Sequence, residues 1–161
     1  MKINILNSQI VLNDDPELEG ITLTIFLSGC DHACKNCHNP VSWDPKNGTI
    51  IDIKEIEDKI DDSVSLIKSL CFCGGEPLLQ PEAVRKLTNK AKSHGLKTIL
   101  YTGYLFEEIS KDIREMIDII IDGRYMDECY QTHYPASTNQ RVFIRGQEVD
   151  PKTLSINQGG F

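Results

Sequence analysis

Three cysteines lie close together at positions 30, 34 and 37, with C-x3-C-x2-C spacing. Thiolates hold iron–sulfur clusters, and three of them on one loop can bind three irons of a [4Fe–4S] cube. The fourth iron then has no protein ligand, and an open coordination position is typical of catalytic rather than structural metal sites. The spacing therefore predicts a reactive [4Fe–4S] cluster held by Cys30, Cys34 and Cys37.

A structural zinc site is the alternative, with His32 or His38 as the fourth ligand. Zinc sites usually combine a C-x2-C pair with a distant second pair, whereas the remaining cysteines here are Cys71, Cys73 and Cys129. Residues 71 and 73 share one face of an expected strand, where we expect small buried hydrophobic side chains rather than metal ligands. The spacing favours the cluster over zinc.

A second motif, Gly74-Gly75-Glu76-Pro77, ends an expected strand. Two glycines allow a ligand to approach the backbone closely, and the glutamate could accept a hydrogen bond from an ammonium group. The alternative is a tight turn that places an acidic residue near a helix N-terminus. Because this motif and the cysteine loop both follow strands, they should meet at the carboxyl edge of a parallel sheet, where α/β proteins bind ligands.

Strand-like and helix-like segments alternate along the chain, which favours βα units. The strands are expected at residues 21–27, 69–73, 97–101, 118–122 and 141–144, and the helices at 52–68, 81–95 and 106–117. Four or five βα units are too few for a closed eight-stranded barrel. We therefore expect an α/β fold, either a small, partial (open) βα barrel with a mainly parallel sheet or a doubly wound sheet, in a single domain over residues 1–161.

The composition narrows the classes of partner. The chain has 17 Lys and Arg against 24 Asp and Glu, a net charge of −7, so it has no general attraction to nucleic acid or anionic lipid. No apolar run is long enough for a transmembrane helix, and the N-terminus is too polar for a signal peptide. We expect a cytoplasmic protein, where clustered cysteines are more often metal ligands than disulfides.

The motifs together resemble the radical S-adenosylmethionine superfamily, and the fuller loop at residues 29–43 closely resembles the anaerobic ribonucleotide reductase activating enzymes. Residues 101–108, 122–125 and 137–141 are similar to the same family, in the right order. The resemblance implies a [4Fe–4S] cluster whose free iron binds the amino and carboxylate groups of S-adenosyl-L-methionine. It also implies cleavage of that molecule to methionine and a 5′-deoxyadenosyl radical, with the electron supplied by a reduced flavodoxin or ferredoxin. The expected partner is anaerobic ribonucleoside-triphosphate reductase, on which the radical creates a glycyl radical.

The resemblance also implies a set of cofactor contacts: Asn36, Cys37, His38, Gly74, Gly75, Glu76, Thr102, Asp122 and Arg124. Asn36 departs from the aromatic residue that many superfamily members have before the third cysteine, which puts only adenine stacking in doubt. Asp122 ends an apolar strand, so its carboxylate needs a partner. That partner is either the polar end of the cofactor, beside Arg124, or Arg124 itself in a surface pair.

Other residues and functions are left open. Trp43 is expected in the core or in the pocket wall, His94 and His133 on the surface, and residues 137–141 in a solvated loop or a partner contact. One alternative function is a radical S-adenosylmethionine enzyme acting on a small molecule, such as a deazapurine-type synthase. Its weakness is that so short a chain has little room for a deep substrate pocket. A zinc-binding interaction module is the other alternative.

Overall fold

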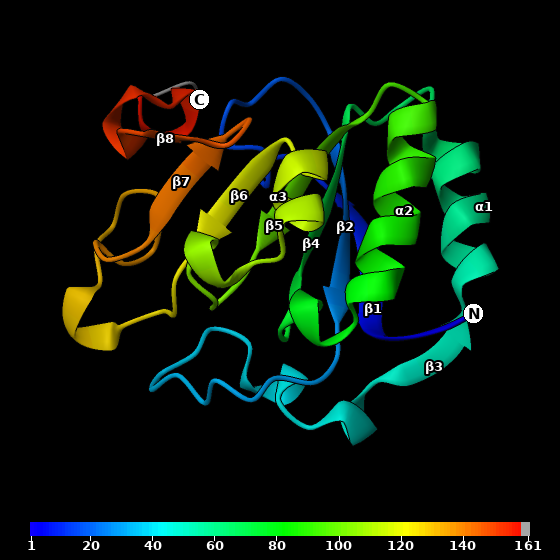
Figure 1. The fold of residues 1–161 in the computed structure, drawn as a ribbon, viewed down its shortest axis with the longest axis horizontal. Coiled ribbons are helices and arrows are strands. Elements are labelled where there is room, and N and C mark those ends of the chain that lie inside the picture. The colour runs from blue at the N-terminus through cyan, green and yellow to red at the C-terminus, as the bar shows by residue number, and fades with distance from the viewer. Residues whose placement is uncertain (159–161) are drawn as a thin grey trace.

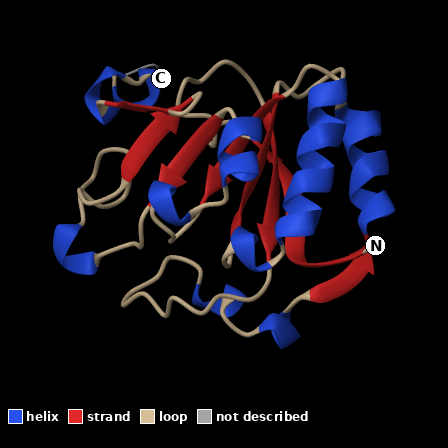
Figure 2. Ribbon diagram, in the orientation of Figure 1, coloured by secondary structure: helices blue, strands red, loops and turns tan. Residues whose placement is uncertain are grey.

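One eight-stranded sheet organises residues 1–158, the part of the chain that this computed structural model describes (Figures 1 and 2). The sheet has the order β3-β1-β2-β4-β5-β6-β7-β8. Its strands are β1 (Lys2–Val11), β2 (Thr22–Leu27), β3 (Thr49–Asp52), β4 (Ser69–Gly74), β5 (Lys97–Tyr101), β6 (Ile119–Asp122), β7 (Arg141–Ile144) and β8 (Gln147–Val149). The α-helices are α1 (Ile53–Ser63), α2 (Pro81–Ser93) and α3 (Lys111–Met116).

The centre of the sheet is parallel, as the alternation of strands and helices predicts. Strands β2, β4, β5 and β6 pair in parallel, and an α-helix lies in each connection between them. The flanking pairs β1/β2, β1/β3, β6/β7 and β7/β8 are antiparallel. The fold is thus the expected open α/β sheet, extended on both sides into a mixed sheet.

Two helical segments differ from the prediction. Helix α1 ends at Ser63 rather than at position 68, and a turn in which Ile67 donates its N–H to the Ser63 carbonyl leads into β4. The expected helix over residues 106–117 is divided into a 3-10 helix at Phe106–Glu108 and the shorter α3. Ile109, between them, has extended backbone angles. Its side chain is nevertheless buried, as are those of Ile113 and Ile117, so the apolar residues that suggested one helix still face the core.

Side chains alternate along the central strands and form a core on each face of the sheet. The three α-helices cover one face, where Ile60 of α1 and Leu87 of α2 belong to the same buried cluster as Phe72 of β4 (Figure 1). The opposite face is packed by a smaller cluster that includes Cys71 and, near the C-terminus, Leu154. The expectation of a buried, hydrophobic side chain is confirmed for Cys71, whereas Cys73 is only half-buried.

The carboxyl ends of the four parallel strands open onto one edge of the sheet. The cysteine loop follows β2, the Gly-Gly-Glu turn follows β4, and further loops follow β5 and β6. Within residues 1–158, no helix has the length and hydropathy that crossing a bilayer requires.

Candidate metal centre and cofactor pocket

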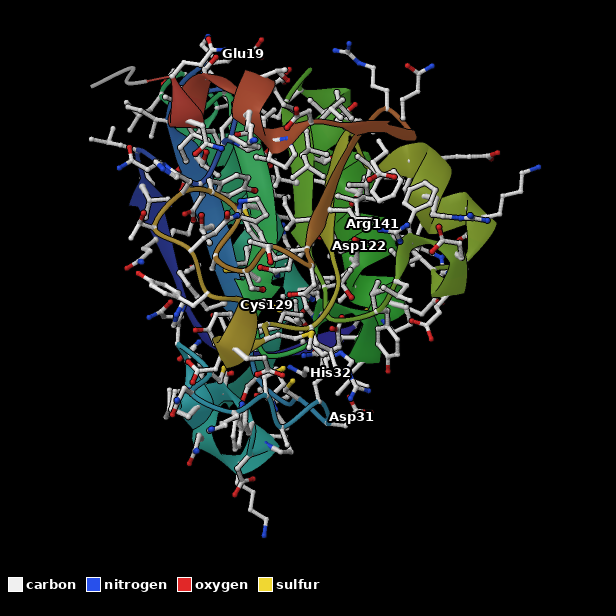
Figure 3. The ribbon with its side chains drawn as sticks, turned by 90° about the vertical axis from the view of Figure 1, so that its left-hand side faces the viewer. Glu19, Asp31, His32, Asp122, Cys129 and Arg141 are labelled. Atoms are coloured by element: carbon white, nitrogen blue, oxygen red, sulfur yellow. The ribbon has the colours of Figure 1, made fainter. Side chains whose placement is uncertain are left out.

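A cavity of about 380 Å³ lies at this carboxyl edge, between the loops that follow the four parallel strands. The structure brings together in its wall most of the residues that the sequence singles out: Cys30, Cys34, Cys37, His38, Gly74, Gly75, Glu76, Thr102 and Arg124. Trp43 and Cys73 also line it. Figure 3 shows sulfur atoms close to His32 at this end of the molecule. Asn36 and Asp122 do not line the cavity.

The cysteine loop curls because residues just before its second and third cysteines adopt left-handed backbone angles. Ala33 has a φ of 49° and Asn36 a φ of 55°. Downstream, the backbone N–H of Asn39 points to the Cys37 sulfur at 3.4 Å. The loop therefore carries three half-buried thiols into the cavity wall, and a backbone amide already points at one of them.

The pKa values of these thiols reflect their surroundings. Burial raises the pKa of Cys30, although the backbone N–H of His32 counteracts part of the shift. Burial also raises the pKa of Cys34, the neighbouring Cys37 adds to the effect, and Arg124 opposes it. Metal ligation requires thiolates, so assembly of a metal centre on this loop must release protons.

The donor set fits a cube-shaped cluster better than one structural zinc ion. A structural zinc ion would need a fourth protein ligand, and His32, one of the two candidates, is paired with Glu76 instead. In a [4Fe–4S] cluster, three thiolates suffice to hold three irons, because each binds a different iron. Three thiols on one loop, beside an open cavity, therefore match the predicted cluster.

Glu76 is the most connected side chain of the site. It is buried, and its carboxylate accepts hydrogen bonds from Thr102 Oγ1 and Gly103 N at 2.8 Å each and from Leu78 N at 2.9 Å. It also pairs with His32 Nε2 at 2.8 Å. From the sequence, His32 was considered only as a zinc ligand, whereas the structure places it against Glu76. The sequence feature that could have indicated a structural role is the position of His32 between Cys30 and Cys34.

The two glycines of the Gly-Gly-Glu turn are required by close contact between loops. A Cβ on Gly75 would lie 2.2 Å from the carbonyl oxygen of Gly29, which immediately precedes the first cysteine. Glu76 N donates to the same carbonyl at 2.8 Å. Gly74 has a φ of +102° and packs against the backbone of Leu27. The turn thus supports the cysteine loop directly.

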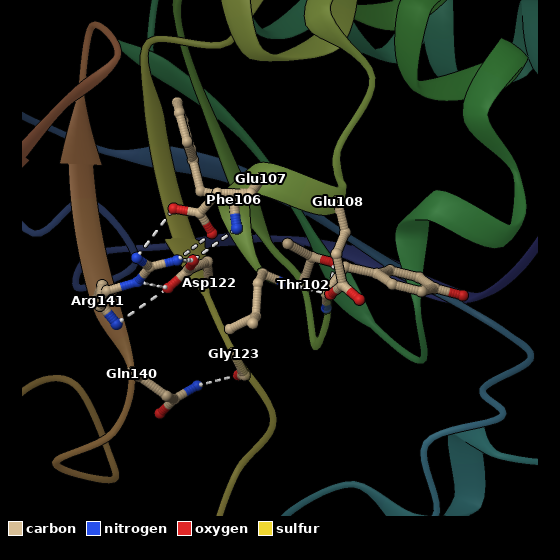
Figure 4. A network of polar contacts seen from close by, with 10 residues as sticks. Thr102, Phe106, Glu107, Glu108, Asp122, Gly123, Gln140 and Arg141 are labelled. Carbon is tan, nitrogen blue, oxygen red and sulfur yellow. Dashed lines mark hydrogen bonds and ion pairs between the residues drawn. The ribbon is translucent and has the colours of Figure 1, made fainter.

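Asp122 has a different partner from the one expected (Figure 4). Its fully buried carboxylate pairs with the guanidinium of Arg141 and accepts a hydrogen bond from Phe106 N at 2.7 Å. Arg141 also binds Glu107 at 2.8 Å, and hydrogen bonds to Glu107 and Asp122 raise the pKa of Arg141. The alternative of an Asp122–Arg124 surface pair is wrong, because Asp122 is buried against Arg141 and Arg124 lines the cavity.

Two further residues of the cysteine loop contact the segment that follows β6. Asn36 Nδ2 donates to Asp127 at 2.8 Å, and the ring of His38 lies 4.7 Å from that of Tyr125. Asn36 therefore joins two loops instead of lining the cavity. His38 takes part in a similar contact while lining it.

Residues 137–141 pack onto the loop after β6. Asn139 Nδ2 donates to the Arg124 carbonyl at 2.9 Å. Gln140 Nε2 donates to the Gly123 carbonyl at 3.1 Å, a contact that Figure 4 shows. Ser137 is buried, so the alternative of a solvated loop is wrong at that position. The expectation for the other histidines is confirmed, since His94 and His133 lie on the surface.

Comparison with known proteins agrees with this geometry. Residues 18–143 match a family model described as a 4Fe-4S single cluster domain. An anaerobic ribonucleoside-triphosphate reductase-activating protein of Enterobacteria phage T4 is 34% identical over 134 residues, which cover 77% of this chain and 84% of that protein. A protein of the same name from Haemophilus influenzae is 33% identical over 68% of this chain and 77% of its own length.

Two more distant proteins extend the comparison. A pyruvate formate-lyase-activating enzyme of Clostridium pasteurianum is 28% identical over 68% of this chain and 48% of its own length. The crystal structure of QueE from Escherichia coli superimposes with a TM-score of 0.52 at 16% identity, over 64% of this chain and 53% of that one, and so supports the fold alone. From the cluster-domain match and the identity to the first relatives, the chain belongs to the family of anaerobic ribonucleoside-triphosphate reductase-activating proteins.

Proposed function

We propose that this protein is a radical S-adenosylmethionine activase that installs a glycyl radical on anaerobic ribonucleoside-triphosphate reductase. One observation carries the proposal: three cysteines of a single loop line the same cavity as the Gly-Gly-Glu turn. The curated relatives are named as activating proteins of that reductase or as an activating enzyme of pyruvate formate-lyase.

The cofactors are a [4Fe–4S] cluster and S-adenosyl-L-methionine. Bound together and reduced by one electron, they supply a 5′-deoxyadenosyl radical, which is the hard chemistry of the reaction. The chain's own part is to hold three irons through Cys30, Cys34 and Cys37, and to enclose the cofactor. Arg124 offers a positive charge at the cavity for the cofactor's carboxylate, and Trp43 forms part of the cavity wall.

The cofactor contacts are further proposals. His38, Gly74, Gly75, Thr102 and Arg124 are suited to contact S-adenosyl-L-methionine because they line the cavity. Asn36, Glu76 and Asp122, by contrast, have protein partners for their polar atoms.

The setting of the reaction follows from its chemistry. A reduced flavodoxin or ferredoxin is a suitable donor of the single electron, and a reducing cytoplasm would keep the thiols available for iron. We also propose that residues 1–161 act as a single radical S-adenosylmethionine domain, since one sheet includes every strand of the described part.

Electron paramagnetic resonance with the partner reductase tests the function. The reconstituted, reduced protein should give a protein glycyl radical signal on the reductase, in step with the formation of 5′-deoxyadenosine. A Cys34→Ala variant serves as the control that should give neither product. If a competent reductase gave no signal while a small molecule drove stoichiometric cofactor cleavage, the small-molecule alternative would replace the activase.

Single cysteine substitutions test the ligand assignment. Cys30→Ala, Cys34→Ala and Cys37→Ala should each abolish the cluster or its redox activity, because the loop has no spare cysteine. Cys71→Ala and Cys129→Ala are the matched controls and should retain the iron of the native protein. Equal loss of iron in Cys71→Ala and Cys34→Ala would mean that the three-ligand assignment is wrong.

A further inference from the structure

The cysteine loop is connected to the ends of β4 and β5 through one buried pair of side chains, His32 and Glu76. We propose that Glu76, acting through His32, is a positioning residue that fixes the cysteine loop over these strand ends. In this role Glu76 is not an acceptor for the cofactor's amino group. The inference rests on the proposed function in one respect, namely that the group held by the three cysteines is a [4Fe–4S] cluster.

The carboxylate of Glu76 is already saturated. Oε1 accepts from Leu78 N at 2.9 Å and from Thr102 Oγ1 at 2.8 Å. Oε2 accepts from Gly103 N and pairs with His32 Nε2, both at 2.8 Å. An ionised carboxylate offers about four lone-pair sites, and four donors occupy them here. An ammonium group could bind only by displacing one of these protein donors.

The ring of His32 is confined on several sides. Its side chain is 5% exposed, and that of Glu76 is 1% exposed. The ring lies edge-on to Tyr104, with 4.8 Å between centroids. A Cβ on Gly103 would lie 2.3 Å from the ring, so only glycine leaves room for it there. The ring thus has one position, and that position is set by the loop after β5 and by Glu76.

The position of His32 in the sequence links the His32–Glu76 pair to the metal centre. His32 stands two residues from both Cys30 and Cys34, so fixing its ring restricts the backbone between two expected iron ligands. Nδ1 of His32 is buried and has no hydrogen-bond partner among residues 1–158, so Nε2 makes the polar anchor of the ring. Groups that hydrogen-bond directly to a metal ligand change metal affinity about 10–100-fold when removed, and we expect a loss in the same range here, where the restraint acts through the backbone.

The test uses His32→Ala, Glu76→Ala, the double variant and His32→Gln, whose amide can still donate to Glu76. Each reconstituted protein is exposed to an iron chelator, and the rate of iron loss is measured. We expect about 10–100-fold faster loss in both single alanine variants, no further increase in the double variant, and near-native loss in His32→Gln. His94→Ala is the matched control, because it breaks an exposed histidine–carboxylate pair with Asp61 at 2.6 Å, and it should behave as the native protein.

A second measurement avoids the cluster altogether. Lys35 is exposed within the cysteine loop, so trypsin cleavage after it reports the order of that loop in iron-free protein. Cleavage should be faster in His32→Ala and Glu76→Ala and unchanged in His94→Ala. Because this readout needs neither iron nor reductase, failure of the proposed function would leave it interpretable.

Two outcomes would overturn the inference. One is a Glu76→Ala protein that keeps native iron retention and native loop proteolysis but loses S-adenosyl-L-methionine affinity, which would make Glu76 a direct cofactor ligand. The other is a His32→Ala protein with native iron retention and native proteolysis, which would leave the pair without a role in positioning.

Discussion

At the scale of single residues, the chemistry of the site can be predicted from the sequence more fully than the contacts between its side chains can. The three cysteines and the Gly-Gly-Glu turn can be found from residue type and spacing, and the structure places them at one cavity. The partner of Asp122 could not be found in this way. Asp122 lies opposite Arg141 in the antiparallel register of β6 and β7, and that register depends on tertiary structure.

Asp122 provides a prediction at this scale. Asp122→Ala removes a buried carboxylate from Arg141 and from the N–H of Phe106, so unfolding free energy should fall by about 1–3 kcal/mol. S-adenosyl-L-methionine affinity of the folded, cluster-loaded variant should remain close to native. Denaturant unfolding and a binding titration measure the two quantities.

Glu107→Ala is the control for that prediction. Glu107 binds the same arginine from an exposed position, so its loss should lower the unfolding free energy much less than the loss of Asp122. A loss of cofactor affinity in Asp122→Ala without a loss of stability would instead support the cofactor role expected from the sequence.

At the scale of elements, the buried parallel strands are the most predictable part. Strand β5 has the expected bounds, and β6 begins one residue later than expected; β6 was recognisable because a buried strand reads as a nearly continuous apolar run. Strands β1, β3 and β8 were missed. β1 is antiparallel and only partly buried, with polar residues along it, and β3 and β8 have only four and three residues. Short or exposed strands carry too little hydrophobic pattern to be recognised without their neighbours.

Contact between two loops gives the prediction at the scale of elements. The sequence alone suggests that enlarging Gly75 weakens cofactor binding without removing iron. The structure changes this expectation, because a Cβ there would lie 2.2 Å from the Gly29 carbonyl. Gly75→Ala should therefore displace the cysteine loop, and both iron content and S-adenosyl-L-methionine affinity should fall, as measured by iron analysis and titration.

The matched control is Gly95→Ala. Gly95 has a φ of +69°, and no atom lies within 4 Å of the position that a Cβ would take there, so alanine should strain only the end of α2, at a cost of about 1 kcal/mol. Its iron content should be native. Native iron content in Gly75→Ala would show that the two loops can separate without loss of the metal centre.

At the scale of the whole molecule, the buried thiol of Cys71 makes stability depend on pH. Burial raises the pKa of Cys71 well above its usual range, and the neighbouring Cys73 adds to the shift. The folded chain therefore keeps a proton that the unfolded chain loses as pH rises. This contribution to stability is complete below the pKa of an unfolded thiol and is lost at higher pH, beginning at about pH 8.5.

Denaturant unfolding of iron-free, reduced protein between about pH 8 and 9.5 tests this dependence. The free energy of unfolding should fall with pH less steeply in Cys71→Ala than in the native protein, by up to about 1.4 kcal/mol per pH unit. The slopes are compared rather than the absolute stabilities, because alanine also leaves a small cavity. Identical slopes would contradict a raised pKa at Cys71.

At the same scale, we expect the reductase to dock at the edge of the sheet where the cavity opens. Exposed apolar side chains follow the strand ends there: Val41, Leu79, Leu105, Met126 and Tyr130. Association with the reductase is favoured when apolar side chains are removed from water. Leu105→Ser should therefore slow glycyl radical formation about fivefold or more. Cofactor cleavage in the absence of the reductase should not change.

Leu66→Ser is the matched control, because Leu66 is 51% exposed against 47% for Leu105 but precedes β4 at the opposite edge of the sheet. The rate of radical formation should be native in this variant. The effect of Leu105→Ser should also persist at high salt, since apolar burial is not screened, whereas any steering of the reductase by the chain's net charge of −7 would weaken. A native rate in Leu105→Ser would contradict docking through Leu105 at the carboxyl edge, and equal slowing by both substitutions would show that the effect of Leu105→Ser is not specific to that edge.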